Sequence, residues 1–170
     1  MSVISNTTVL SNFAAIGSLD RLQELYGEIY LSTEVYQEIQ RGLEEGYTFY
    51  SGIEEILRPT REHGWLRLTS LSNEKEVLVF SNMPGQLHAG EASCLAIAQE
   101  RSWLLLTDDK AARRCALDRN ISVSGTLGCL VLGVDRSLWT LDQANRWLER
   151  IIASGFFSPV MDVSGLVKRA

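Results

Sequence analysis

Short apolar runs alternate with amphipathic stretches along this sequence, and that alternation constrains the fold more than any other feature. Two of the runs are residues 3–5 and 103–107, and between them lie stretches with small apolar residues at helical spacing, such as Ala92, Leu95 and Ala96. Strands of a parallel sheet that helices cover on both faces are buried on both sides, so they appear as continuous apolar runs. The pattern therefore predicts the α/β class with a parallel sheet, in which the strand at 103–107 is central.

Signals for helix starts and for turns divide the rest of the chain between further strands and helices. We expect other strands at residues 28–31, 65–68 and 121–123. Ser32, and Asp108 or Asp109, offer side-chain oxygens to the free N–H groups at the start of a helix. We expect a polar loop ahead of Met83-Pro84-Gly85 and a C-terminal helical tail over residues 138–170.

Length and composition set the domain organisation and exclude several classes of protein. A chain of 170 residues and 19.0 kDa can bury a core without further support, so we expect a single domain over residues 1–170. Its net charge of −5 argues against a protein that coats DNA or anionic membrane by bulk charge. Cys94, Cys115 and Cys129 lack metal-site spacing, which predicts buried thiols in a cytoplasmic protein. No run reaches the ~18 apolar residues of a membrane span, so we expect no membrane partner.

Polar residues at or after predicted strand ends are the candidates for chemistry, because the sequence has no G-x-G-x-x-G, Walker or G-x-S-x-G motif. These candidates are Asn6, Glu38, Glu91, Asp108 and Asp109. The carboxyl ends of parallel strands share one sheet edge, where residues distant in sequence converge. Carboxylates in one crevice repel each other unless a cation neutralises them, and a hard oxygen cluster selects Mg²⁺ or Mn²⁺. Such ions activate water, which suits hydrolysis of phosphodiesters.

Each acidic candidate also has a purely structural interpretation. Asp108 and Asp109 suit a helix N-cap, and Glu91 suits the first turn of a helix, where negative charge is favoured. Glu38 suits an exposed helix face. The functional interpretation therefore depends on whether these residues converge.

Three basic residues follow the acidic pair at i, i+3 and i+4 of one predicted helix: Lys110, Arg113 and Arg114. Beside a metal site, such a basic stripe would hold the phosphates of an RNA strand, because arginine contacts phosphate in a bidentate manner. The alternative is an ordinary solvated helix face.

The sequence resembles the PIN domain family, a metal-dependent nuclease fold that includes many bacterial toxin ribonucleases. Four segments carry the likeness: Val3-Ile4-Ser5-Asn6-Thr7-Thr8-Val9-Leu10-Ser11-Asn12, Ile29-Tyr30-Leu31 through Val35-Tyr36-Gln37-Glu38-Ile39, Gly90-Glu91-Ala92 and Leu105-Leu106-Thr107-Asp108-Asp109-Lys110-Ala111-Ala112-Arg113. Residues 121–130 and the tail Gly155-Phe156-Phe157-Ser158 look like one prokaryotic subgroup of PIN-like proteins. The resemblance spans nearly the whole chain and is weakest over residues 47–84.

This resemblance implies a three-layer α/β/α sandwich with a central parallel sheet, one or two Mg²⁺ or Mn²⁺ ions, and endonucleolytic cleavage of single-stranded RNA. It also implies a homodimer, and many members are toxins that a small antitoxin protein neutralises. Carried over residue by residue, Glu38, Glu91 and Asp109 become metal ligands, with Asp108 and Thr8 in supporting positions.

The match fails at Asn6, where the family has its first acidic ligand. An amide brings no charge and places an NH₂ group where a second oxygen would lie, so we expect weaker cation binding and cleavage that is slow, favours Mn²⁺ or is absent. Two functions remain open: a metal-dependent endoribonuclease, and a non-catalytic module that binds RNA or a protein. A receiver-like signalling domain is excluded, because no acidic pair follows the first strand.

Overall fold

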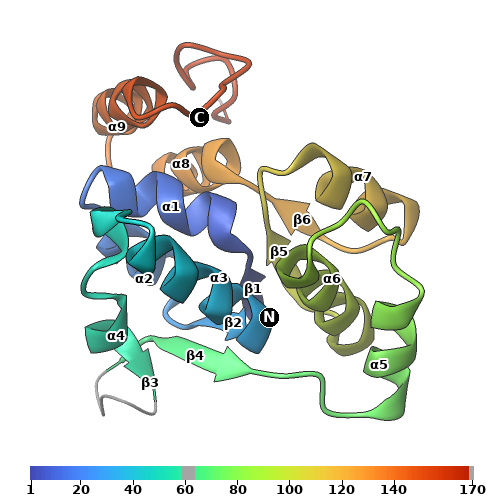
Figure 1. The fold of residues 1–170 in the computed structure, drawn as a ribbon. Helices are drawn as coiled ribbons and strands as arrows, with labels where there is room; N and C mark the ends of the chain where they lie inside the picture. Colours follow the sequence, from blue (N-terminus) through green and yellow to red (C-terminus); the bar gives the residue numbers. More distant parts are fainter. Residues whose placement is uncertain (59–63, 169–170) are drawn as a thin grey trace.

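The computed structural model describes residues 1–58 and 64–168, and in this part of the chain six strands form one parallel sheet (Figure 1). In chain order the strands are β1 (Val3–Ser5), β2 (Ile29–Ser32), β3 (Leu57–Arg58), β4 (Leu66–Thr69), β5 (Leu104–Leu106) and β6 (Val123–Ser124). The sheet order is β3-β4-β2-β1-β5-β6, and each neighbouring pair is parallel. The predicted α/β class is confirmed, and β5 lies inside the sheet between β1 and β6.

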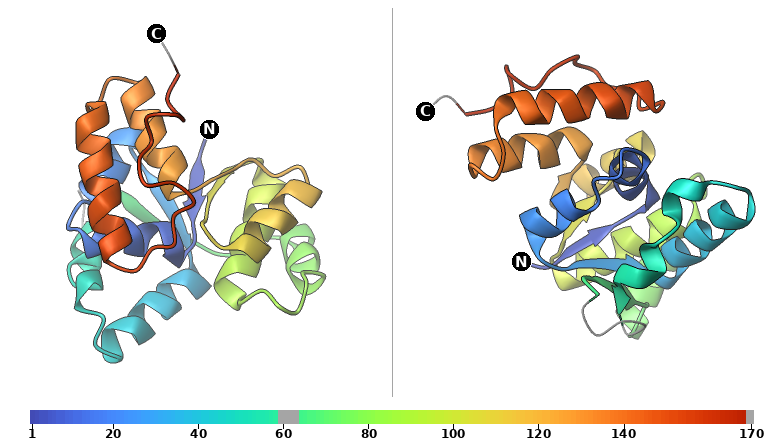
Figure 2. Two further views of the ribbon diagram at one scale, coloured as in Figure 1. Left: turned by 90° about the horizontal axis from the view of Figure 1, so that it is seen from above. Right: turned by 90° about the vertical axis from the view of Figure 1, so that its left-hand side faces the viewer.

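Helices cover both faces of this sheet. They are α1 (Thr7–Ala15), α2 (Asp20–Tyr26), α3 (Thr33–Glu44), α4 (Ile53–Ile56), α5 (Glu74–Ser81), α6 (Ala89–Arg101), α7 (Lys110–Asp118), α8 (Thr126–Asp135) and α9 (Leu141–Ala153), with a 3-10 turn η1 (Thr48–Tyr50). Figure 2 shows α1, α8 and α9 on one side of the strands and α6 and α7 on the other. The α3 helix contacts both α1 and α6. These layers are those of the expected α/β/α sandwich.

The register of the central strands brings the candidate residues together. Ser5 at the end of β1 pairs with Leu106 at the end of β5, and both are fully buried. The backbone N–H of Asn6 continues this pairing by donating to the carbonyl oxygen of Leu106 at 3.1 Å. Asn6 and Thr107 therefore leave the sheet side by side, although 101 positions separate them in sequence.

Two predictions of secondary structure are wrong. The segment ahead of Met83 is not a polar loop, because it contains α5, whose N-cap Asn73 accepts a hydrogen bond from the backbone N–H of Glu76. The C-terminal tail is helical only as far as Ala153, since Gly155 takes a φ of +107° and the chain from 154 to 168 has no helix. This part of the chain instead returns over α8 and α9 (Figure 2).

A buried ion pair explains why α5 packs as it does. Arg101, the last residue of α6, donates from Nε to Oε1 of Glu76 at 2.6 Å. Its guanidinium also donates to Thr69, the last residue of β4, and to Ser70, which follows it. The Glu76 side chain is only 1% exposed. Its hydrogen bonds from Arg101 outweigh the effect of burial and lower the pKa of Glu76 to about 2. The pair fastens α5 and the end of β4 to α6.

The cysteines are free and buried, as predicted. Cys94 lies on α6 with its Sγ 3.5 Å from the carbonyl oxygen of Ser5, and burial raises the pKa of its thiol to about 12. Within the described residues, no helix combines the length and the apolar character that crossing a bilayer requires.

Candidate active site at the carboxyl ends of the strands

Asn6 joins the end of β1 to the end of β5. Its side chain is nearly inaccessible, and its Oδ1 accepts hydrogen bonds from the backbone N–H of Thr8 at 3.1 Å and from the Thr8 hydroxyl at 2.8 Å, which caps α1. Its Nδ2 donates to Oγ1 of Thr107 at 2.7 Å. Both ends of the amide are therefore occupied by protein partners.

Asp108 connects β5 to the helices on one face of the sheet. Its carboxylate accepts hydrogen bonds from the backbone N–H and the hydroxyl of Thr126, at 2.9 and 2.5 Å, and from Nδ2 of Asn12 at 3.1 Å. Its backbone N–H donates to Oγ1 of Thr8 at 2.9 Å. Gly125 allows this approach, since a Cβ there would collide with the Asp108 carboxylate. Thr8 and Asp108 thus occupy positions that support their neighbours.

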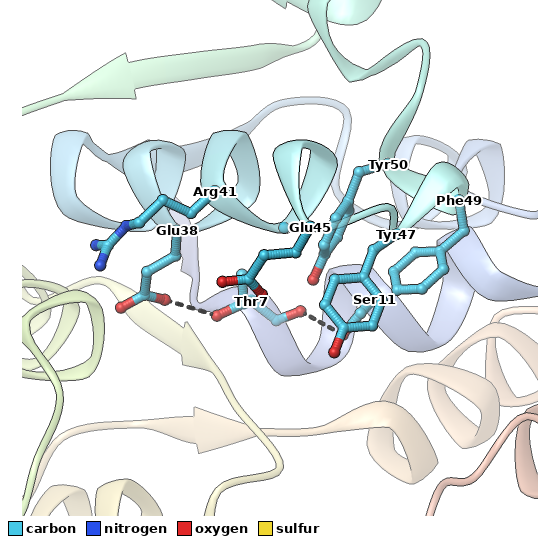
Figure 3. Close-up of a pocket in the computed structure, with 9 residues that line it drawn as sticks. Thr7, Ser11, Glu38, Arg41, Glu45, Tyr47, Phe49 and Tyr50 are labelled. Carbon is cyan, nitrogen blue, oxygen red and sulfur yellow. Dashed lines mark hydrogen bonds between the residues drawn. The ribbon is translucent and has the colours of Figure 1, made fainter.

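Glu38 reaches the same edge of the sheet from α3. Its Oε2 accepts a hydrogen bond from the Thr7 hydroxyl at 2.9 Å (Figure 3), and its Oε1 accepts one from the backbone N–H of Gly90 at 3.2 Å. A Cβ at position 90 would lie 2.6 Å from Oε1. The glycine therefore lets a carboxylate from α3 meet the first turn of α6, where the helix dipole favours negative charge.

Glu91 and Asp109 approach this edge from the starts of α6 and α7. Each makes a capping interaction: Glu91 accepts from the backbone N–H of His88 at 3.0 Å, and Asp109 accepts from that of Ala112 at 2.7 Å. Burial raises the pKa of Glu91, the His88 contact opposes that effect, and the charges on Asp109 and Glu38 raise the pKa further. Burial is the largest of these effects on Glu91, and the charges of Asp109 and Glu38 add to it.

A divalent cation fits the chemistry of this set of donors. Glu38, Glu91 and Asp109 offer only oxygen atoms. Burial is the main cause of the raised pKa of Glu91, and the negative charges of Asp109 and Glu38, which a cation would offset, add to it. Across residues 1–58 and 64–168, however, no three His, Cys, Asp or Glu side chains form a group that could hold a metal ion. The protein donors described above leave further acceptor positions on each of these carboxylates.

The three basic residues of α7 lie in different surroundings. Arg113 donates from a terminal nitrogen to the carbonyl oxygen of Thr107 at 3.0 Å, which places its guanidinium at the candidate site. The Lys110 Nζ lies 5.6 Å from the centre of the Phe157 ring in the tail. Arg114 is 80% exposed and pairs with an acid one turn later on the same helix. Arg113 is therefore hydrogen-bonded at the turn that carries the acidic pair, and Lys110 lines a hollow together with Asp108 and Asp109.

Sequence reasoning missed three polar residues that organise this edge: Asn12, Thr107 and Thr126. Thr107 is buried, and its hydroxyl oxygen accepts from both Asn6 and the backbone N–H of Asp109. Asn12 and Thr126 hydrogen-bond each other at 3.0 Å and both bind Asp108. A hydroxyl immediately before the acidic pair was the available signal for Thr107, whereas the pairing of Asn12 with Thr126 has no signal in the local sequence.

Comparison with known proteins identifies the family of this chain. A model of the PIN domain family matches residues 2–170, which include every candidate residue described above. No curated protein gives a match. PIN domains are typically metal-dependent nucleases, and the parallel sheet with acidic residues at its carboxyl edge agrees with this assignment. Because the match covers nearly the full length, the chain belongs to the PIN domain family.

Proposed function

We propose that this chain is a metal-dependent endoribonuclease that cleaves single-stranded RNA at the carboxyl edge of its sheet. The observation that carries the proposal is the position of the Glu38 carboxylate, which reaches from α3 to the Thr7 hydroxyl just after β1 and to the backbone N–H of Gly90, the residue before Glu91. Helix capping accounts for individual hydrogen bonds of Glu91 and Asp109, but it gives no reason for a carboxylate of α3 to lie against the first turn of α6 beside Glu91. A site for a divalent cation gives that reason.

In this proposal Glu38, Glu91 and Asp109 hold the cation, and neighbouring groups position them. A bound divalent cation lowers the pKa of a coordinated water and stabilises the charge that develops on the leaving oxygen. Asp108 is a positioning residue, because its hydrogen bonds to α1 and α8 fix the turn that carries Asp109. Arg113 lies beside that turn, where its remaining N–H groups can donate to a phosphate of the RNA.

In this proposal Asn6 limits the rate of RNA cleavage. Its amide carries no charge, and its two ends are already bonded to Thr8 and Thr107, so it contributes little to the binding of a cation. We therefore expect cleavage to be slower than a carboxylate at this position would support. The same observation favours a second candidate function, a non-catalytic module that binds RNA or a protein partner at this edge.

The Asn6→Asp variant separates these two functions, because it restores a charge with almost no change in size. The Thr107 hydroxyl can donate its proton to the new carboxylate while it still accepts from the backbone N–H of Asp109, so the packing is preserved. We expect slow cleavage of 5′-labelled single-stranded RNA by the parent protein with Mn²⁺ or Mg²⁺. We expect the variant to be faster by on the order of tenfold or more, and EDTA to stop both reactions.

The matched control is the double variant Asn6→Asp, Glu91→Gln, which removes the charge of a proposed ligand and keeps the size of its side chain. It should lose the gain in cleavage. RNA binding without cleavage in both the parent and Asn6→Asp, with either metal, would support the non-catalytic module instead. Rapid EDTA-sensitive cleavage by the parent would overturn the proposed effect of Asn6.

We also propose two protein partners, a small antitoxin and a second copy of this chain. Their support is the family resemblance, in which toxins with neighbouring antitoxins and dimers are frequent. A small reading frame immediately beside the gene, whose product relieves growth arrest when the two are expressed together, would identify the chain as a toxin. Light scattering of the purified protein tests the homodimer directly.

A further inference from the structure

A cavity of about 350 Å³ lies beside the candidate site, between α1, α3 and the turn η1 (Figure 3). Thr7, Glu38 and Arg41 line one end of it, and the rings of Tyr47, Phe49 and Tyr50 line the other. Thr7 and Glu38 are also the hydrogen-bonded pair that brings α3 to the carboxyl edge of the sheet. The cavity is therefore continuous with the proposed cation site.

One face of α3 forms the wall of this cavity, because Glu38, Gly42 and Glu45 recur at helical spacing. Gly42 lets two rings approach the helix closely. A Cβ at this position would lie 3.1 Å from the ring of Tyr50 and 3.4 Å from that of Tyr47. The glycine thus allows the rings of Tyr50 and Tyr47 to pack against α3 beside the site.

The three rings form a supported platform rather than a buried core. Tyr50 is only 7% exposed, whereas Phe49 is 36% and Tyr47 is 51% exposed. The ring centres of Phe49 and Tyr50 are 4.5 Å apart, and those of Tyr47 and Phe49 are 5.8 Å apart. The ring planes are tilted by 54° in the first pair and by 49° in the second. The buried Tyr50 ring thus supports Phe49, which contacts Tyr47, and a base can stack on the exposed face of one ring at a time.

We propose that Tyr47 and Phe49 form a subsite that stacks one unpaired nucleobase of the RNA whose phosphodiester binds at Glu38. This inference rests on the proposed function, since the strand is held there by the cation site. A nucleotide that flanks the bound phosphate borders the cavity, because Glu38 lines both places. Arg41 offers a positive charge to an adjacent phosphate, and Glu45 offers an acceptor to amino groups at the edge of a base.

Stacking on these rings requires a base that is free of its own helix. In double-stranded RNA the bases are stacked on one another and their faces are covered. The subsite therefore selects single strands, and aromatic stacking tolerates any base because every base has a π-face. It contributes affinity for a nucleotide beside the cleaved bond without specifying a sequence.

Removal of the bases from the RNA tests this proposal without requiring a known binding register. The probes are a 5′-fluorescein-labelled hexanucleotide of RNA and a ribose-phosphate hexamer that has no bases, measured by anisotropy with Ca²⁺ and again with EDTA. We expect Tyr47→Ala to weaken binding of the hexanucleotide by roughly 5- to 100-fold. The same variant should bind the base-free hexamer as the parent does, while Tyr47→Phe should keep the parent affinity for both probes.

Two further variants guard against indirect effects. Phe49→Leu keeps apolar bulk but removes a ring, so it should weaken hexanucleotide binding in the same selective way. Leu78→Ala truncates an exposed apolar side chain on α5, 65% exposed and outside the cavity lining, and should change neither affinity. Thermal unfolding of each variant checks that the fold is intact.

The outcomes distinguish failure of the subsite from failure of the proposed function. If the parent binds and cleaves RNA while Tyr47→Ala and Phe49→Leu bind the hexanucleotide normally, the subsite is wrong and the nuclease proposal stands. Equal weakening of binding to both probes would also overturn the subsite. If the parent neither binds nor cleaves any single-stranded RNA, the proposed function fails first, and the cavity then fits a side chain of a protein partner better.

Discussion

Nδ2 of Asn6 lies 2.7 Å from Oγ1 of Thr107, and this hydrogen bond joins the carboxyl ends of β1 and β5. The same hydroxyl oxygen accepts the backbone N–H of Asp109 at 3.1 Å. One threonine therefore holds the first and the last candidate residue of the site in place. The arrangement explains how an amide can replace a carboxylate here without disturbing the fold.

Replacing this threonine should destabilise the protein measurably. Thr107→Val keeps the shape of the side chain but leaves a buried donor, Nδ2 of Asn6, and a partly buried one, the N–H of Asp109, without their acceptor. We therefore expect the free energy of unfolding in urea to fall by about 1–3 kcal/mol. Thr107→Ser keeps the hydroxyl and should retain most of the stability. An equal loss in both variants would assign the effect to the packing of the methyl group instead.

Gly90→Ala should damage the candidate site more than the fold. The new Cβ would meet the Glu38 carboxylate at 2.6 Å, and because that oxygen belongs to a side chain, Glu38 can swing away and relieve the clash. We expect the increase in melting temperature caused by Mn²⁺ to shrink or vanish in this variant. Gly85→Ala, where a Cβ meets nothing within 4 Å, is the matched control and should respond to Mn²⁺ as the parent does.

The salt dependence of RNA binding should show whether the basic residues of α7 contact phosphates. Arg113→Ala combined with Arg114→Ala should weaken binding of single-stranded RNA and lower the slope of log K against log salt by roughly 0.7 for each phosphate that is no longer neutralised. We expect Arg113→Ala to account for most of the change, because Arg114 is turned toward an acid on its own helix. Arg146→Ala on α9 removes another exposed arginine in an i,i+4 pair and should leave the slope unchanged. An unchanged slope in the double variant would make the stripe a solvated helix face.

The ion pair of Glu76 with Arg101 should shape the acid stability of the fold. The pKa of Glu76 is about 2 in the folded protein and 4.5 for an ordinary glutamate, so the unfolded chain takes up the proton first as the pH falls. The pair therefore stabilises the fold above pH 4.5, and this contribution, about 3 kcal/mol, is lost as the pH falls from 4.5 toward 2.

Urea unfolding between pH 7 and pH 2 measures this effect. Glu76→Gln should be less stable than the parent at pH 7, and its stability should fall less steeply below pH 5. Glu74→Gln, which changes an exposed acid on the same helix, is the matched control and should follow the parent. Parallel pH profiles for Glu76→Gln and the parent would contradict the assignment.

Local patterns in the sequence predicted five of the six strands that the structure describes, all but β3, and the positions of the candidate residues, because both depend on short segments. Strands such as Leu104–Leu106 are continuous apolar runs, and polar residues directly after them must lie at one edge of a parallel sheet. The family match over residues 2–170 confirms the resemblance that these segments carry. The roles of the individual residues stay predictions.

What the sequence did not predict depends on partners that are distant along the chain. In the sequence Glu76 resembles a solvated acid, because its partner Arg101 lies 25 positions later, at the end of another helix. The platform of Tyr47 and Phe49 lies in a segment without regular spacing, and its place beside Glu38 follows only from the packing of η1 against α1 and α3. The tail beyond Ala153 has apolar residues that suggest a helix, but a left-handed Gly155 ends the helix first.

Because Cys94 is buried, the rate at which a reagent labels its thiol reports how often the site opens. Cys94 lies one turn after Glu91 on α6, fully buried and with its thiol directed to the end of β1. A thiol reagent can reach it only when the start of α6 separates from the sheet, so the rate of its labelling counts those openings. A cation or an RNA that bridges α3, α6 and α7 should slow the labelling of Cys94, whether or not any bond in the RNA is broken.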